Sequence, residues 1–313
     1  MTVKSALFLA SKVIGLAIAM FILFSVGASV FTANSAMAQQ MSPEESAASG
    51  ARLLVVCLID TVVLTYFIKR SRLSGLRLMV VVALVFYGVK TFISIIEAWW
   101  FMNNLTPEEI PGLFLMTVPM AVLFPPVAVW VLGKAKKPAP ADEAPNTRLV
   151  MPIGQLVWKV ALLSVVIYPL LFWTFGYYVA FSNPELVAFY GDTHPGSFLA
   201  QMSNVWAEDP LVFAFEILRG ALWVALAAPV IRTTKGRVWE AGLIVVLLFT
   251  LVQNDAHLLP GAMPPSVRLS HFIETASSNL IYAVIVTWLM HREHRSLRDL
   301  FRVRRAEPAT VAG

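Results

Sequence analysis

Eight apolar stretches, each long enough to cross a lipid bilayer as a helix, recur along this chain of 313 residues. A transmembrane helix needs about 20 predominantly apolar residues. Charged residues make up only 14% of the chain, whereas a soluble domain carries roughly 25%, so the charges are too few to cover a water-exposed surface. The sequence therefore predicts an all-α, polytopic integral membrane protein with about eight transmembrane helices and with membrane lipids as partners.

The predicted spans divide the chain into two four-helix halves, residues 1–133 and 151–291. Their approximate boundaries are 4–31, 52–68, 78–102, 112–132, 153–181, 211–231, 238–259 and 265–290. A linker rich in proline, alanine and charged residues (134–150) joins the halves, and a basic tail (292–313) follows the last span. The linker has the composition of a solvated, disordered segment.

The first span has two interpretations. It begins with Lys4 and Lys12 and is followed by Ala-Met-Ala at 36–38, which resembles the cleavage site of a signal peptide. Its apolar core is longer than the roughly 7–15 residues of a signal-peptide core. We therefore expect an uncleaved helix.

Basic residues gather at one end of the predicted spans. They lie in or next to the two termini, the linker, and the connections at 69–77 and 232–237, and only four of the 24 Lys and Arg residues lie elsewhere: Arg52, Lys90, Arg219 and Arg268. By the positive-inside rule, both termini are predicted to be cytoplasmic, in a multi-pass protein of a bacterial inner membrane. Because this asymmetry accounts for the net charge of +5, no nucleic-acid partner is implied.

The two halves share a weak internal repeat. In each half the second span ends in a basic hairpin, and two further spans follow. The matched positions are Lys12 and Lys159, Arg70 and Arg232, and Glu97 and His257. Four spans per half make such a repeat parallel, with its axis along the membrane normal, although helical hairpins also resemble one another by chance.

Ionisable residues gather in the predicted outer half of several spans, where burial is costly and indicates a site. His271 and Glu274 are three residues apart, so they share a helix face, which Ser278 continues. Glu216 and Arg219 have the same spacing on another span. The sequence therefore predicts a polar pocket that opens toward the outer face.

Two more spans contribute to this pocket. Asn254 and His257 share a face near the end of the seventh span, where Asp255 is expected to point away unless Pro260 loosens the last turn. On the third span, Glu97 ends a stripe that also contains Tyr87, Lys90 and Ser94. Convergence of polar residues at one depth is the main reason to expect a shared site.

Deeper in the membrane, Asp60 and Lys90 flank one hairpin at similar depth. We expect an ion pair between them, since neither charge is comfortable alone in hydrocarbon. A role in helix packing is favoured over a direct role in function.

The leading functional interpretation is an enzyme that acts on a lipid or other amphiphile at the outer leaflet. His257, His271 and Glu274 are predicted as catalytic residues, and they would also supply three ligands for a divalent metal such as zinc. Further roles are acid/base catalysis by Glu97 and Asp255, and substrate binding by Glu216, Arg219, Asn254 and Arg268. No HExxH-type spacing supports a metal, so a hydrogen-bonded network that stabilises helix ends is the competing interpretation.

Two other functional classes remain open. Buried Asp60, Lys90, Glu97 and Glu216 suit a proton- or ion-coupled transporter, and a fourfold-plus-fourfold repeat suits alternating access. A non-catalytic membrane subunit that binds a lipid, a quinone or a partner protein is the third class. The single cysteine, Cys57, excludes an intrachain disulfide and a CxxC redox pair, and the sequence lacks a phosphate loop, a Rossmann fingerprint and a haem-attachment motif.

Overall fold

The computed structural model describes residues 2–32, 43–102, 105–136, 146–191, 196–259 and 263–301. The segment that resembles a cleavage site, most of the linker and the end of the basic tail lie outside these ranges. Within the described ranges the secondary structure is helical, with one isolated β-bridge between Ser71 and Thr234.

The chain is an all-helical, polytopic membrane protein of about eight helices. Within the described ranges, seven helices are long and apolar enough to cross a membrane. Four of them are single α-helices: α1 (Val3–Phe31), α3 (Pro43–Arg70), α12 (Leu211–Thr233) and α14 (Pro265–Met290). The other three are interrupted: α4–η1–α5 (Gly75–Tyr87, Gly88–Phe92, Ile93–Phe101), α6–α7 (Ile110–Met116, Val118–Val131) and α8–η2–α9–η3 (Ile153–Ala161, Leu162–Ile167, Tyr168–Phe175, Gly176–Ala180).

The seventh predicted span is shorter than its apolar pattern indicates. It consists of α13 (Val238–Leu247) and the π-helix η4 (Leu248–Val252), and a separate 3₁₀ turn, η5 (Asp255–Leu258), follows. At about 1.5 Å per residue, α13 and η4 together extend about 22 Å, less than the roughly 30 Å of a hydrocarbon core. The expected boundary at 259 is therefore corrected to Val252, because the widened π-turn ends the regular helix early.

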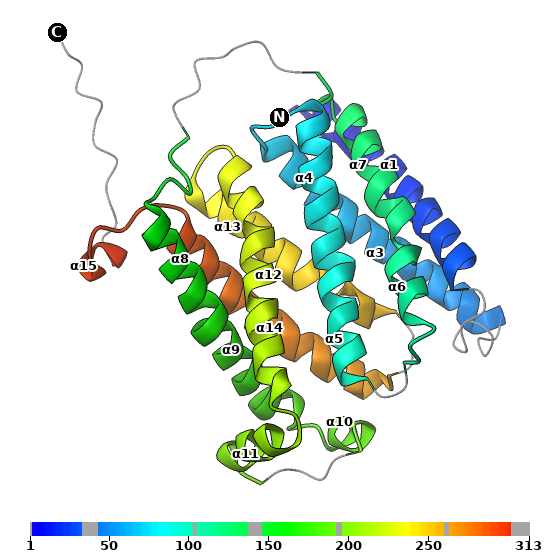
Figure 1. Ribbon diagram of the computed structural model, residues 1–313. Helices are drawn as coiled ribbons and strands as arrows, with labels where there is room; N and C mark the ends of the chain where they lie inside the picture. The colour runs from blue at the N-terminus through cyan, green and yellow to red at the C-terminus, as the bar shows by residue number, and fades with distance from the viewer. Residues whose placement is uncertain are drawn as a thin grey trace.

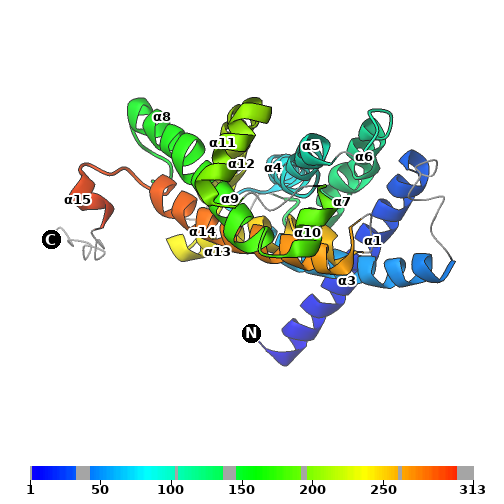
Figure 2. The ribbon, with the colours of Figure 1, turned by 90° about the horizontal axis from the view of Figure 1, so that it is seen from below.

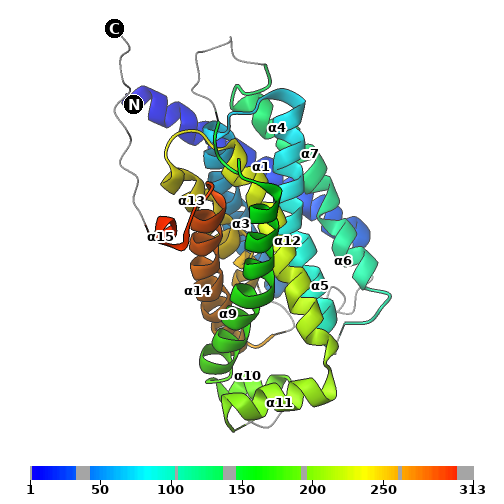
Figure 3. The same ribbon diagram turned by 60° about the vertical axis from the view of Figure 1, so that its left-hand side comes forward.

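The two ends of the bundle differ in charge and in covering. The N terminus and the α12–α13 connection lie at one end (Figure 1), which we call the basic end. The short helices α10 (Pro184–Phe189) and α11 (Phe198–Glu208) lie across the opposite end, as Figure 3 shows. We call this the acidic end because Glu185, Glu208 and Asp209 lie there.

The hydrophobic core lies where the two halves meet. Figure 2 looks along the bundle and shows the helices of the two halves on opposite sides, with α12 next to α4 between them. Trp223 of α12 packs on Phe249 of η4 with ring centroids 4.2 Å apart, and both side chains are fully buried. Outward faces of the spans expose large apolar side chains such as Leu84, Val122 and Leu218, as expected of surfaces in contact with lipid.

The first helix is integrated into this bundle. α1 packs against α3, α6 and α7. Its Lys12 donates a hydrogen bond to the carbonyl oxygen of Val131 at the end of α7, at 2.6 Å. A lysine suits this position because helix C-termini carry unpaired carbonyl groups and partial negative charge.

Candidate functional site

The site is built around two π-helices in the middle of the bundle. η1 interrupts the third span and contains Lys90, and η4 ends the seventh span just before Gln253. Widened turns of this kind free backbone carbonyls and occur often at functional sites. Irregular backbone at membrane depth is tolerated only where it is buried in protein or lines a cavity.

Two asparagine side chains satisfy the carbonyls released by η4. Asn254 Nδ2 donates to the carbonyl oxygens of Thr250, at 3.0 Å, and Phe249, at 3.4 Å. Asn279 Nδ2 on α14 donates to the same Phe249 oxygen at 3.2 Å, and to Gln253 Oε1. Asn254, predicted as a substrate-binding residue, is thus engaged in holding the end of the helix, and Thr275 Oγ1 donates to its oxygen.

Three charged side chains from different elements meet beside this helix end. Lys90 Nζ lies 2.9 Å from Asp60 Oδ2 on α3 and 2.5 Å from Asp255 Oδ1 on η5. All three side chains are at most 9% exposed. We call Asp60, Lys90 and Asp255 the lysine triad.

Asp255 occupies a different place from the one expected. The sequence grouped it with the outer pocket as an acid/base residue and expected it to point away from the shared face. The chain leaves helical geometry after η4, and the 3₁₀ turn directs the carboxylate inward onto Lys90. The expected pair of Asp60 and Lys90 is therefore a group of three, with two carboxylates around one ammonium.

The lysine triad is incompletely satisfied. Asp60 Oδ1 and Asp255 Oδ2 are buried and have no hydrogen-bond partner in the described part of the chain. With both carboxylates ionised, the triad carries one excess negative charge in an apolar interior. A buried charge of this kind is costly unless a proton or a cation neutralises it.

A second group, which we call the arginine cluster, consists of Glu97, Glu216 and Arg219. One guanidinium nitrogen of Arg219, Nη1, lies 2.9 Å from both oxygens of Glu216, and Nη2 pairs with Glu97 of α5. The guanidinium carbon also lies near three aromatic rings, 5.7 Å from the centroid of Tyr168, 5.4 Å from Phe172 and 5.7 Å from Phe215. Cation–π contacts therefore add to the two ion pairs.

A close helix approach places Arg219 among these rings. The neighbouring residue, Gly220, packs against η2, where an added Cβ would meet the backbone of Ser164 and the side chain of Tyr168. Only a residue without a side chain permits this spacing. Tyr282 Oη on α14 also donates to the Gly220 carbonyl at 3.0 Å, which fixes the position of α12 relative to α14.

A third group, the histidine relay, consists of Tyr190, His271 and Glu274. His271 Nδ1 lies 3.2 Å from Glu274 Oε2, and its Nε2 lies 2.9 Å from Tyr190 Oη. Burial, and then the nearby charges of Glu97 and Glu274, raise the pKa of Tyr190, so its hydroxyl keeps its proton. The hydrogen bonds then run from Tyr190 to His271 and from His271 to Glu274.

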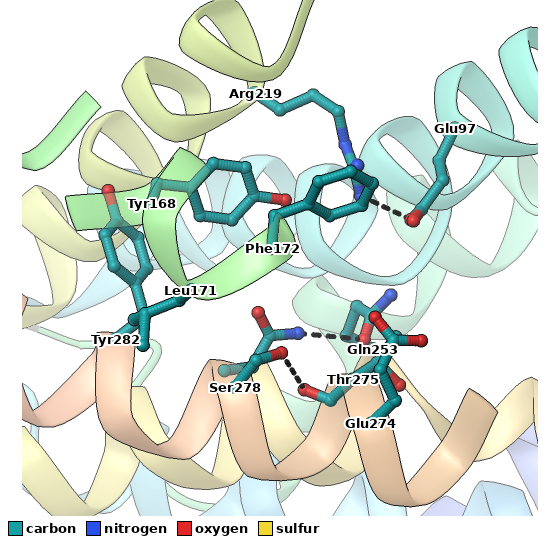
Figure 4. A pocket seen from close by; sticks show the side chains of 11 residues that line it. Glu97, Tyr168, Leu171, Phe172, Arg219, Gln253, Glu274, Thr275, Ser278 and Tyr282 are labelled. Atoms are coloured by element: carbon teal, nitrogen blue, oxygen red, sulfur yellow. Dashed lines mark hydrogen bonds and ion pairs between the residues drawn. The ribbon is translucent and has the colours of Figure 1, made fainter. Parts of the chain in front are cut away.

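A small cavity separates the arginine cluster from Glu274. Figure 4 shows Arg219 and Glu97 on one side, Glu274, Thr275 and Ser278 on the other, and the rings of Tyr168, Phe172 and Tyr282 closing a third side. The free space is about 10 Å³, close to what one water molecule requires. The cavity therefore suits a water molecule or a group of similar size, and it is too small for a lipid chain.

The predicted metal ligands do not form a metal site in the described residues. No group of three or more His, Cys, Asp or Glu side chains in these ranges is arranged to hold an ion. His271 uses both ring nitrogens on protein partners, and His257 only stacks on it, with ring centroids 5.9 Å apart. The zinc-type centre at His257, His271 and Glu274 therefore stays a prediction that these contacts do not support.

One further predicted binding residue also has a structural partner. Arg268 Nη1 donates to the carbonyl oxygen of Leu259 at 2.9 Å, and so stabilises the end of η5. The residues that line the cavity and that sequence reasoning missed are Tyr168, Leu171, Phe172, Gln253, Thr275, Asn279 and Tyr282. Tyr282 continues the stripe of His271, Glu274 and Ser278 at helical spacing, so extending that stripe by one turn would have found it.

Comparison with known proteins adds no further assignment, since no protein-family model, no curated protein and no solved structure matches this chain.

Proposed function

We propose that the protein is a proton-coupled membrane transporter in which two four-helix halves move relative to each other around the lysine triad. One observation carries this proposal: Lys90 is buried between two carboxylates, Asp60 on α3 of the same half and Asp255 on η5 of the other. Ionisable groups buried within a membrane bundle characteristically mark proton or ion pathways.

Matching features of the two halves support this function. The third helix of each half contains a π-helix, η1 at Gly88–Phe92 and η4 at Leu248–Val252, although the π-helices η2 and η3 of the fifth span have no counterpart in α1. In each half a lysine of the first helix binds a carbonyl oxygen near the end of the fourth. Lys12 binds that of Val131, the last residue of α7, at 2.6 Å, and Lys159 binds that of Arg292, two residues beyond α14, at 2.8 Å. Repeats related by an axis along the membrane normal are a common transporter architecture.

The contacts between the halves have the reciprocity expected of such a repeat. α3 packs against α13 and η4, and α12 packs against α4 and η1. At the basic end, Ser71 and Thr234 form an antiparallel bridge in which Arg72 N donates to Thr233 O and Lys235 N to Arg70 O, both at 2.6 Å. The hairpins at matched positions thus touch each other, as they do across a two-fold axis.

The charge balance of the triad gives a coupling mechanism. When both carboxylates are ionised the triad is negative, and it needs access to water or to a cation. Taking up one proton makes it neutral, so that the surrounding apolar side chains can close over it at lower cost. Protonation therefore biases the equilibrium between an open and a closed arrangement of the two halves.

The arrangement described here is closed on the basic side, which we infer to be cytoplasmic. Phe67 on α3 and Phe86 on α4 lie on the basic-end side of Asp60 and Lys90 along their helices, and both are fully buried, as are Trp223 and Phe249. The polar groups of the arginine cluster and the histidine relay lie toward the acidic end. Opening to the cytoplasm would require the halves to separate along this aromatic layer.

Cys57 provides a reporter for this movement. The thiol is 1% exposed, and Cys57 lies one turn before Asp60 on α3. We would label it with a membrane-impermeant maleimide in oriented membrane vesicles at pH 5.5 and pH 8.5. The thiolate is the reactive species and its fraction rises with pH, so each rate is divided by the rate of a free thiol at the same pH. Transport predicts that this relative rate depends on pH and on the accessible side, because opening exposes the interior next to the triad.

The matched variants make this experiment decisive. Asp60→Asn removes one titrating carboxylate and should abolish the pH dependence of labelling, whereas Glu108→Gln changes an exposed carboxylate in the α5–α6 connection and should leave it intact. A Cys57 that stays unlabelled from both sides at every pH would contradict transport. A labelling rate unchanged by Asp60→Asn would remove the triad from the mechanism.

A second function, an enzyme acting on an amphiphile, is favoured by the histidine relay. His271 lies between a phenol and a carboxylate, an arrangement that can hold and pass a proton, and its side chain is 17% exposed. Such an enzyme would need His271 and Glu274 and would not need the lysine triad. Release of a water-soluble product from purified lipids that is lost in His271→Gln and retained in Asp60→Asn would select this function over transport.

A further inference from the structure

The cavity between the arginine cluster and the histidine relay has an excess of negative charge. Its lining contains two carboxylates, Glu97 and Glu274, and a single guanidinium, that of Arg219, which pairs with Glu97 and also with Glu216 outside the lining. Glu274 is 4% exposed, and its ion-pair partner in the described ranges is His271. With His271 neutral, Glu274 stands as an uncompensated buried carboxylate on the wall opposite Arg219.

Aromatic faces line the same cavity. Tyr168 and Phe172 lie within cation–π distance of the Arg219 guanidinium, and Tyr282 packs edge-on against Tyr168 with ring centroids 5.1 Å apart. Aromatic faces combined with carboxylates are the surroundings that recognise ammonium groups. Anions are disfavoured there, because the excess charge of the wall repels them.

The size of the cavity restricts the ligand further. About 10 Å³ of free space accommodates a group as large as one water molecule, which is also the size of an ammonium group. Its wall offers acceptors for N–H donors, namely the Glu97 and Glu274 carboxylates, Ser278 Oγ and Thr275 Oγ1. A primary ammonium group has three donors and therefore fits this set better than a quaternary one.

The cavity lies on the side from which cations are attracted. Of the two carboxylates that line the cavity, the Glu97 side chain is 24% exposed and that of Glu274 is 6% exposed, so the cavity is more accessible at Glu97 than at Glu274. Exposed Glu108, Glu185 and Glu208 lie at the same end of the bundle. Clustered carboxylates at the entrance raise the local concentration of cations.

We propose, building on the transport function above, that this cavity binds the primary ammonium group of the transported substrate. Arg219 holds Glu97 and Glu216 in place, and Glu274 receives the ammonium group. The cargo is thus an organic amine, bound apart from the proton site at the lysine triad. Small amines and ethanolamine lipid headgroups both carry this group, and the test below separates the two sources.

Isothermal titration calorimetry on the purified, full-length protein tests this inference. Methylammonium chloride would be titrated at pH 7, with tetramethylammonium chloride as a probe of equal charge that has no N–H donor. We expect saturable binding of methylammonium and binding of tetramethylammonium that is weaker by about tenfold or more, as the loss of charged hydrogen bonds implies. Equal affinity for the two cations, or no saturable heat with methylammonium, would overturn the inference.

Variants locate the binding site. Glu274→Gln and Glu97→Gln should each lower the affinity for methylammonium by about tenfold or more, whereas Glu108→Gln should not. Using both variants keeps the test valid if one of them fails to fold. Unchanged affinity in a folded Glu274→Gln protein would place the amine elsewhere and contradict the assignment.

Vesicles and Cys57 labelling separate the remaining outcomes. If phosphatidylethanolamine in reconstituted membranes competes with methylammonium, the source is a lipid headgroup, and if it does not compete, the source is a soluble amine. Cys57 labelling that depends on pH without any amine binding would refute the cation site and leave the transport function standing. Amine binding with a Cys57 that is never labelled would refute its role as cargo.

Discussion

The third helices of the two halves begin alike and end differently. α4–η1–α5 and α13–η4 both start at the basic end and both contain a π-helix. The first continues through α5 to Phe101, whereas the second stops at Val252. One half thus contributes a side chain from within a continuous span, Lys90, and the other contributes Asp255 from a broken one.

This difference shows how a two-fold frame can hold an asymmetric site. A widened turn in a continuous helix shifts the side chains that follow it by only one residue. A widened turn at a helix end releases the chain, so the next carboxylate can point in a new direction. The lysine triad uses a widened turn of each kind, because the ammonium of Lys90 and the carboxylate of Asp255 must approach each other from opposite halves.

Replacement of Lys90 should lower the stability of the protein more than any other change in the lysine triad or the arginine cluster. Lys90→Met leaves Asp60 and Asp255 buried without their cation, and removal of one partner from a buried pair typically costs about 3–5 kcal/mol. We expect a large drop in the thermal unfolding midpoint of the purified protein. The double variant Lys90→Met with Asp60→Asn should recover part of the loss, and no recovery would show that the carboxylate is not the cause.

The arginine cluster should give the next largest effect. Arg219→Met leaves Glu216 fully buried without its cation, for which we expect about 2–4 kcal/mol of destabilisation. Adding Glu216→Gln should restore stability, since the amide needs no counter-ion. A midpoint equally low in the single and double variants would argue that packing against the aromatic rings, rather than charge, is what Arg219 provides.

Comparison of the two π-helices gives a smaller, paired prediction. Asn254→Ala removes the donor to two carbonyls of η4 and should cost about 1–3 kcal/mol. Thr91 of η1 makes only a hydroxyl contact with Thr117, at 2.7 Å, so Thr91→Val should cost less. Equal thermal shifts in the two variants would mean that the Asn254 hydrogen bonds stabilise the broken helix no more than the Thr91 contact stabilises the continuous one.

The lysines at the helix ends should give the smallest effects. Lys12→Met and Lys159→Met each remove one bond to a terminal carbonyl oxygen, worth about 0.5–1.5 kcal/mol. Lys159 is fully buried, and its Nζ lies 2.8 Å from His294 Nδ1, whereas Lys12 is partly exposed. We expect the larger midpoint shift for Lys159→Met, and the reverse order would show that burial and the contact with His294 add no stability at this position.

Part of the candidate site follows from helical spacing alone. Glu216 with Arg219, and His271 with Glu274, are pairs at three-residue spacing, which brings side chains together on any helix. Contacts between helices did not follow in this way. Glu97 meets Arg219 only because α5 and α12 are rotated and placed so that these two faces meet, and apolar spans of similar composition do not encode that rotation locally.

The sequence by itself determined the helical class and the approximate spans, because about 20 consecutive apolar residues with few charges leave a chain no soluble alternative. It also determined which helix faces are polar, since the 3.6-residue period is a local property. Only the tertiary structure decided that the seventh span breaks at Val252, that Asp255 turns onto Lys90, and that aromatic side chains close the cavity. These features depend on contacts between residues far apart in the chain, where packing at close range selects one backbone conformation among several of similar local energy.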